Sequence, residues 1–419
     1  MKKILIIFII TLILGILGWF FLIQRDGGGS SGDSQENVGF FGGLFSDDSV
    51  LGLDEERPPL TFENEGGFVG FGFDDNLVLK RRQFGESVLQ QLTTTPVAGF
   101  VATTTSDGAP SVRFVERITG NIYQVDPEKI ESVRVTNTTI PGVYEAVWNK
   151  NATRVVLRYL DENDVIKTFN AHIVSGTSVS TLDGRFLPDD IDFFTADDVG
   201  ENIFYTIRGD RETLLKKSSF NGSGVETIYR SFLHELLYEI TNSGKIFFTT
   251  KASGLVAGLV YSLEEGGGAV PEKLLDGILG LTVNTSPYGD RILLSKSTSG
   301  DFGLFLFELK TRDMRLFSVK TLPEKCGWSP VNRNIVYCGV PFVVSEDLYP
   351  DSWYQGKISF SDSIWEIDVS RDVTRLLVDL RLERDLTIDM VNLAVSESGE
   401  YLFFINKRDS SLWSLRLGK

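Results

Sequence analysis

Histidine, cysteine and basic side chains are scarce in this sequence, and each scarcity excludes a class of protein. The 419 residues include two histidines and two cysteines, and 41 basic against 57 acidic side chains give a net charge of −16. His172 and His234 are too few and too far apart in the chain for a histidine-rich metal site. The acidic field repels nucleic acid phosphates, whose neutralisation needs clustered Lys and Arg. We therefore expect no nucleic acid partner and no metal or other cofactor.

Complete catalytic motifs are also missing. The sequence contains no Gly-x-Ser-x-Gly elbow and no Asp-x-Asp-x-Asp-Gly calcium loop. Carboxylates gather at 161–164, 189–192 and 197–198, where turn residues surround them, and these runs are typical of solvated loops. The sequence thus favours a binding role and leaves catalysis open.

One long apolar run stands at the N-terminus. Ile4 to Ile23 form 20 residues that suffice to cross a hydrocarbon core of about 30 Å. The run is too long for the core of a cleaved signal peptide, which has about 7–15 residues. Lys2 and Lys3 precede it, and the positive-inside bias places the N-terminus in the cytoplasm. We predict a signal anchor at 1–25, with the rest of the chain in the periplasm or at the cell surface.

Residues 26–86 differ sharply from the remainder in composition. They are rich in Gly, Ser and Asp, with runs such as Gly27-Gly28-Gly29-Ser30-Ser31-Gly32. Such composition is typical of a flexible linker.

Beyond Ser87, short runs of Val, Ile, Phe, Tyr and Thr alternate with clusters of Gly, Asn, Asp and Ser, which indicates an all-β domain. A polar turn followed by an apolar strand recurs seven times. These turns begin at residues 106, 149, 197, 242, 286, 329 and 396. The first five steps are 43 to 48 residues long, close to the roughly 40–50 of a four-stranded propeller blade.

The repeat predicts a seven-bladed β-propeller over 87–419. The last copy ends after its third strand, at 411–417, and an unpaired outer edge there would expose a pairing surface. We predict that 87–93 supplies the missing strand and closes the ring.

At these turns the chain resembles the TolB-type and WD-like β-propellers of bacterial envelopes, whose repeats carry a Ser-Pro-Asp-Gly turn. The resemblance is carried by Ser286-Pro287, Ser329-Pro330 and Ser396, while Tyr288 and Val331 stand where the family has aspartate. It implies a propeller that acts as a binding scaffold, and it names no ligand.

The two cysteines, Cys326 and Cys338, bracket a predicted hairpin. Opposed residues in an antiparallel pair have Cα atoms about 4.5–5.5 Å apart, which a disulfide can span. An exported compartment permits oxidation. We predict the bridge, against the alternative of two reduced cysteines packed as small apolar residues.

The step of 67 residues contains an insertion between the second and third strands of blade six. Its candidate partner-binding residues are aromatic, because Tyr and Trp are enriched at binding hot spots: Phe342, Tyr349, Trp353 and Tyr354. The alternative is a loop that folds its aromatics onto the blade. Arg113 and Arg117 in blade one are further candidates for an anionic ligand, although pairing with the surrounding acidic surface is favoured.

These observations predict a membrane-tethered, extracytoplasmic β-propeller that binds protein partners in the cell envelope. The alternative is a surface propeller that binds or processes carbohydrate with loop carboxylates and Trp353. A purely structural spacer is a third interpretation.

Overall fold

The computed structural model describes residues 80–105, 107–176, 180–189, 191–197, 202–264, 270–381 and 385–418. The predicted anchor at 1–25 and nearly all of the predicted linker at 26–86 lie outside these residues. Within the described ranges, no helix is long and apolar enough to span a membrane.

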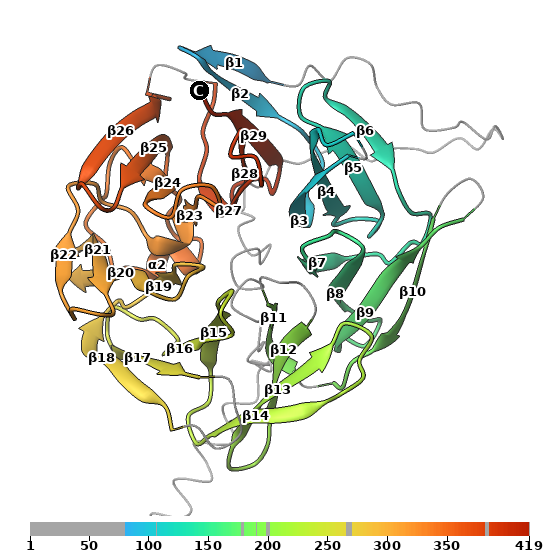
Figure 1. Cartoon of the computed structure of the whole chain (residues 1–419), viewed down its shortest axis with the longest axis horizontal. Coiled ribbons are helices and arrows are strands. Elements are labelled where there is room, and N and C mark those ends of the chain that lie inside the picture. The colour runs from blue at the N-terminus through green and yellow to red at the C-terminus, as the bar shows by residue number, and fades with distance from the viewer. Residues whose placement is uncertain are drawn as a thin grey trace, which may run out of the picture. The chain divides into compact units, whose positions relative to one another are not determined.

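The described residues form seven antiparallel sheets arranged around a central axis as the blades of a propeller (Figure 1). In blades one to six, four strands follow one another from the axis outward. Blades one to three comprise β3 (Val97–Thr104), β4 (Pro110–Glu116), β5 (Ile122–Asp126), β6 (Glu131–Arg134), β7 (Val143–Trp148), β8 (Arg154–Leu160), β9 (Ile166–Val174), β10 (Thr181–Phe186), β11 (Ile191–Ala196), β12 (Asn202–Arg208), β13 (Thr213–Ser219) and β14 (Glu226–Ser231). Blades four to six comprise β15 (Leu236–Ile240), β16 (Ile246–Thr250), β17 (Ala257–Leu263), β18 (Glu272–Leu279), β19 (Val283–Thr285), β20 (Arg291–Thr298), β21 (Asp301–Glu308), β22 (Met314–Leu316), β23 (Cys326–Trp328), β24 (Ile335–Pro341), β25 (Asp362–Asp368) and β26 (Val373–Val378). The prediction of an all-β, seven-bladed propeller is confirmed.

Blade seven combines strands from both ends of the propeller. Its inner strands are β27 (Met390–Val395), β28 (Tyr401–Asn406) and β29 (Leu412–Arg416), and its outer strands are β2 (Ser87–Gln91) and β1 (Arg81–Phe84). β2 pairs antiparallel with β29, so the ring is closed by the strand that the incomplete last repeat requires. The sheet also continues one strand further than predicted. Because β1 pairs with β2, the predicted end of the linker at residue 86 is wrong.

The recurrent polar turns all connect the first strand of a blade to its second, so they lie at the same end of the ring. We call this end the turn face. In blade five, Ser286 Oγ donates to Asp290 Oδ1 at 2.6 Å. In blade seven, Ser396 Oγ accepts from the Tyr401 amide at 3.0 Å. A short hydroxylated side chain at the start of the turn thus bonds across it, which is why Ser recurs there.

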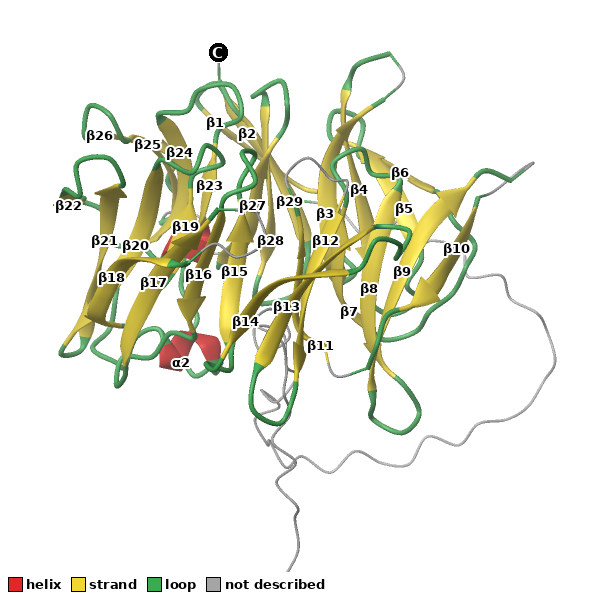
Figure 2. Cartoon of the chain, turned by 60° about the horizontal axis from the view of Figure 1, so that its bottom comes forward, coloured by secondary structure: helices red, strands yellow, loops and turns green. Residues whose placement is uncertain are grey.

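The opposite end carries the second-to-third loops, the connections between blades and the short helix α2 (Asp351–Tyr354). We call it the α2 face. Figure 2 shows α2 at this end of the ring, together with the loop between β12 and β13. The 3₁₀ helix η1 (Pro323–Lys325) lies in the connection between blades five and six.

The core lies between neighbouring blades, where apolar side chains of adjacent sheets pack together. The inner strands of blades one and two approach so closely that a Cβ atom at Gly99 would lie 2.1 Å from the Ala146 carbonyl oxygen. Only glycine fits there. In blade six, Cys326 lies opposite Cys338 and the two are joined by a buried disulfide, as the hairpin predicts.

Candidate functional site

The insertion of blade six departs most from the repeat. It comprises residues 342–361, between β24 and β25, and we call it the strap because it crosses the α2 face (Figure 2). The Asp347 amide donates to the Gly300 carbonyl oxygen of blade five at 3.3 Å. The Gly254 amide of blade four donates to Asp351 Oδ2 at 2.7 Å. The strap therefore links blade six to blades five and four.

The aromatic side chains of the strap are buried rather than presented to solvent. Tyr349 is 1 % exposed and Trp353 is 0 % exposed. The Tyr349 ring stacks on Phe360, with centroids 6.0 Å apart, and lies 4.6 Å from the ring of Phe302 in blade five. Phe342 packs, partly buried, against the core between blades six and seven. Tyr349 and Trp353 are thus placed as in the alternative interpretation of the insertion, with both rings filling the core beneath the strap.

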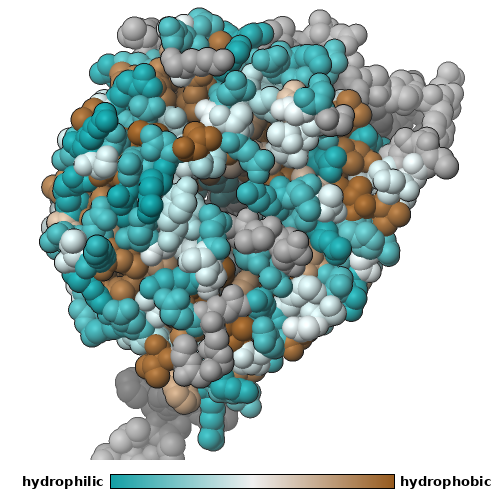
Figure 3. All heavy atoms as spheres, viewed as in Figure 1, coloured by the Kyte–Doolittle hydropathy of each residue, from teal (hydrophilic) through white to brown (hydrophobic). Residues whose placement is uncertain are grey.

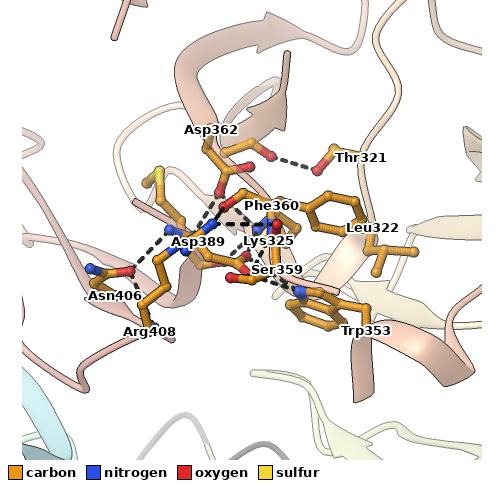
Figure 4. Close-up of polar contacts among 12 residues, drawn as sticks. Thr321, Leu322, Lys325, Trp353, Ser359, Phe360, Asp362, Asp389, Asn406 and Arg408 are labelled. Carbon is orange, nitrogen blue, oxygen red and sulfur yellow. Dashed lines mark hydrogen bonds and ion pairs between the residues drawn. The ribbon is translucent and has the colours of Figure 1, made fainter. Parts of the chain in front are cut away.

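A buried cation holds this arrangement together (Figure 4). Lys325, the last residue of η1, has its Nζ 2.7 Å from Asp362 Oδ2 and donates to Asp389 Oδ1 as well. All three side chains are fully buried. Asp362 begins β25 and Asp389 immediately precedes β27, so the cluster joins blade six to blade seven. We call these three residues the Lys325 cluster.

The strap is bonded directly to this cluster. Asp389 Oδ2 accepts hydrogen bonds from Trp353 Nε1, Ser359 Oγ and the Phe360 amide, each at 3.0 Å (Figure 4). A buried carboxylate is tolerated only when it is paired and hydrogen-bonded. The strap supplies the donors that Asp389 needs, and Asp389 in turn fixes the position of the strap.

The cluster shifts the titration of its own members. Burial raises the pKa of Asp362 to about 6, and the Asp389 carboxylate adds to the rise against the pull of Lys325. Burial alone would raise the pKa of Asp389, but the Lys325 ammonium and the hydrogen bonds to the carboxylate lower it. Asp362 Oδ1 has no hydrogen-bond partner among the described residues. Asp362 is therefore the carboxyl that takes up a proton first on acidification.

Two carboxylates beside Trp353 are the arrangement that a carbohydrate-processing site would need. Here, however, the carboxylates are buried, share one ammonium ion and are inaccessible to a substrate. The Lys325 cluster is a structural anchor for the strap, and Trp353 is not placed to contact a sugar.

A cavity of about 360 Å³ lies beside the strap, along the inner strands of blades three to six. Ala252 and Tyr354 line it toward the α2 face, and Thr241, Ser286 and Pro287 line it toward the turn face. Since the strap covers the α2 end, we infer that the cavity opens at the turn face. Figure 3 shows that face, where hydrophilic residues predominate around a hollow near the centre.

The strap reaches this cavity through Tyr354. Its hydroxyl donates to Glu324 Oε1, while Glu324 Oε2 accepts from Thr282 Oγ1 at 2.9 Å. Burial raises the pKa of the Glu324 carboxyl. Burial, with the adjacent Glu324 carboxylate, also raises the pKa of Tyr354. Of the predicted partner-binding aromatics, Tyr354 is thus the one that lines a cavity.

Three further polar side chains of the cavity are held in place by hydrogen bonds. Glu239 Oε2 accepts from the Thr285 amide at 2.7 Å. Asn284 Nδ2 donates to the Cys326 carbonyl oxygen at 2.8 Å, and its Oδ1 accepts from Trp328 Nε1 at 2.9 Å. The cavity therefore combines fixed carboxylates with the aromatic side chains of Trp328 and Tyr354.

The two candidate arginines lie elsewhere. Arg113 donates to Gln124 Oε1 at 2.8 Å and to the Ala152 carbonyl oxygen at 2.7 Å, which links blade one to blade two. Burial lowers the pKa of Arg113. Arg117 Nη1 lies 3.4 Å from Ser410 Oγ of blade seven. Neither arginine lines the cavity, and Arg113 bonds an amide and a carbonyl rather than the acidic surface.

Sequence reasoning missed Lys325, Asp362 and Asp389. The signal was present, because Asp389 stands inside the apolar run Leu386-Thr387-Ile388-Asp389-Met390-Val391 and Lys325 directly precedes a buried strand. A charge within a core segment predicts a buried partner. Which partner it finds depends on the ring, since Lys325 and Asp389 are far apart in sequence.

In the part of the chain that the structure describes, no three or more His, Cys, Asp or Glu residues are grouped as metal ligands.

The sequence matches no protein-family model and no curated protein sequence. Its fold is similar to that of oligogalacturonate lyase from Vibrio parahaemolyticus, at 10% identity over 81% of this chain and 96% of the lyase, with a TM-score of 0.53. TolB from Acinetobacter baumannii is 12% identical over 72% of this chain and 78% of its own, with a TM-score of 0.43. The propeller domain of the Trilobed protease from Pyrococcus furiosus is 11% identical over 81% and 95%, with a TM-score of 0.45. The likeness to the lyase is one of fold alone.

Proposed function

We propose that this chain is a membrane-tethered, extracytoplasmic β-propeller that binds a protein partner, and that the partner inserts a segment into the central cavity from the turn face. The observation that carries the proposal is the cavity itself. It measures about 360 Å³, is covered by the strap at one end and is lined by hydrogen-bonded carboxylates and aromatic side chains. Concave sites with a few fixed polar groups are where ligands bind.

The charge of the site indicates the chemistry of the partner. Glu239 and Glu324 line the cavity, and the chain as a whole carries a net charge of −16. Such a field attracts positive segments and steers their approach. A partner loop that carries Lys or Arg is therefore the expected occupant.

The tether supports a binding role. Residues 4–23 would anchor the chain, and a glycine-rich linker would follow, so the propeller would meet partners on the same membrane at a high effective concentration. A moderate affinity would then suffice for assembly.

Site-specific photo-crosslinking in the native membrane tests the proposal. A photoreactive residue at Leu237, which lines the cavity, should give an adduct with one defined protein, and the same residue at exposed Val133 on outer strand β6 should not. The adduct should disappear in Glu239→Lys, which reverses a cavity charge. An unchanged adduct in that variant, or none at 237, contradicts the proposal.

Carbohydrate binding is the second candidate, and one observation favours it. Trp328 and Tyr354 line the same cavity as Glu239 and Glu324, and sugars are bound by aromatic faces together with carboxylates. A glycan array probed with the full chain separates the two candidates. Glycan binding that is lost in Trp328→Ala, with no protein adduct at 237, would favour the carbohydrate.

A further inference from the structure

Two neighbouring loops of the α2 face expose large apolar side chains. Phe232 is 86 % exposed, Leu255 75 % and Val256 65 %, and Leu233 is exposed beside them. The loops lie together because Leu236 pairs with Thr250, so residues 232–235 precede β15 and residues 251–256 follow β16 at the same end of the blade. We call these four side chains the blade-four tips. Exposed apolar groups clustered in this way mark a contact with a protein or a membrane.

The strap braces the second of these loops. The Gly254 amide donates to Asp351 Oδ2, and a Cβ atom at Gly254 would lie 2.6 Å from the Tyr349 carbonyl oxygen. The loop is therefore pressed against the strap at its glycine, directly before Leu255. With the backbone held there, Leu255 and Val256 remain at the surface instead of folding onto the blade.

The N-terminal segment joins the propeller at the same face. β2 leads through residues 92–96 into the first strand of blade one, so it ends at the α2 face. β1 runs antiparallel to β2 with Arg81 opposite Gln90, which places the start of β1 at that face. Lys80 Nζ confirms the location by donating to the Asp385 carbonyl oxygen, in the connection between blades six and seven, at 2.7 Å. The chain that carries the apolar run Ile4–Ile23 therefore leaves from the α2 face.

We propose that the blade-four tips insert into the lipid surface of the membrane that anchors the chain. This inference rests on the proposed anchor at residues 4–23. Apolar side chains on the tips of projecting loops can enter the headgroup and acyl boundary to a depth of about 5–10 Å. The anchor would raise the effective concentration of the tips at this membrane, which would compensate for the small area of the contact.

Charge defines the kind of surface. Lys251 and Glu235 lie on the two loops and are exposed, so the charge of these loops is balanced. The net charge of −16 opposes an anionic leaflet. Insertion is therefore apolar and tolerates salt. With the α2 face against lipid, the cavity mouth at the turn face points away from the bilayer.

Fluorescence quenching on the reconstituted full chain tests the inference. The native cysteines form a buried disulfide, so Leu255→Cys can be labelled selectively with an environment-sensitive fluorophore in phosphatidylcholine vesicles. We expect a blue-shifted emission and a loss of fluorescence with spin-labelled lipids, unchanged at high salt. Val331→Cys, 61 % exposed in a first-to-second turn on the turn face, is the matched control and should show neither effect.

The outcomes are separable. If the chain does not float with the vesicles, the proposed anchor fails. If it floats and the label at 255 is quenched no more than the label at 331, this inference is overturned while the anchor stands. A label at 255 that is unquenched in pure lipid but shielded in native membranes would assign the tips to a protein instead. In the supporting case, Phe232→Ser should weaken quenching at 255 without changing the melting temperature, because Phe232 is exposed.

Discussion

Two fully buried cations, Lys325 and Arg158, show how the same interaction serves different purposes in two regions of the ring. Arg158 lies in β8 of blade two, 3.2 Å from the Glu145 carboxylate, and donates to the Ile191 carbonyl oxygen of blade three at 2.8 Å. Lys325 meets two carboxylates, one of which is also bonded to the strap. The Arg158 pair therefore joins two blades of the regular repeat. The Lys325 cluster holds an element that the repeat does not contain.

The two sites also differ in which elements satisfy their polar atoms, although Asp362 Oδ1 of the Lys325 cluster, too, has no hydrogen-bond partner among the described residues. Arg158 Nε and the nearby Tyr144 hydroxyl have no hydrogen-bond partner among the described residues, and the Arg158 guanidinium lies over the Tyr144 and Phe194 rings at 5.8 and 5.5 Å. Asp389 is saturated by donors from the strap. A buried ion pair is weak evidence for stability and better evidence for specificity. Lys325 thus specifies the place of the strap, and with it the closed end of the cavity.

Lys325→Met should produce the largest effect. It leaves two buried carboxylates without their ion-pair partner, and removal of one partner of a buried ion pair costs about 3–5 kcal/mol. We expect a lower free energy of unfolding in urea and faster proteolysis within 342–361. Lys320→Met, which removes a partner of Asp301 at the surface, is the control and should change little. If the strap of Lys325→Met resists protease as well as that of the parent, Lys325 does not hold the strap and does not differ from Arg158 in this respect.

Arg158→Met should destabilise the protein somewhat less, because it strands one carboxylate instead of two. Removal of both charges in Arg158→Met/Glu145→Leu should restore most of the loss, since a buried pair replaced by apolar residues of similar size is often neutral. The strap should stay protected from protease in both variants. A double variant as unstable as the single one would show that Arg158 acts through its other contacts, such as the Ile191 carbonyl oxygen.

The Lys325 cluster should make the stability of the protein depend on pH through Asp362. The pKa of Asp362 is about 6 in the folded state and about 3.9 in the unfolded chain. Between these values the folded state binds a proton that the unfolded state lacks. The contribution of Asp362 to stability is thus present below pH 4 and is lost as the pH rises through 6.

Asp362→Asn removes this titration. The melting temperature of the variant minus that of the parent should be most positive at pH 7 and should fall steadily to pH 4.5. In the free energy of unfolding, this change is on the order of 1 kcal/mol. Shared groups that do not interact with Asp362 cancel in this difference. A difference that is flat over this range would exclude Asp362 as the titrating member.

Features that recur with the repeat could be predicted from the sequence. Contacts between residues that only the closed ring brings together could not. The first-to-second turns, the missing fourth strand of the last blade and the insertion after β24 were all visible as period and composition. The burial of Trp353 was not, because an aromatic residue in a long loop has the same local pattern whether it faces solvent or core. Trp353 is buried because Asp389, 36 residues away in sequence, accepts a hydrogen bond from its indole nitrogen inside the protein.

Tyr354→Phe should have the smallest effect on stability, and it tests whether the position of the strap depends on the cavity as well as on Lys325. It removes the hydrogen bond from the strap to Glu324, while Thr282 still donates to the carboxyl. The loss of one such bond costs about 1 kcal/mol. Tyr288→Phe, an exposed tyrosine of the turn face, is the control. If the strap is as sensitive to protease in Tyr354→Phe as in Lys325→Met, its position depends on the bond to Glu324 in the cavity rather than on the buried cation. If it stays protected, the bond from Tyr354 to Glu324 is not needed to hold the strap over the cavity.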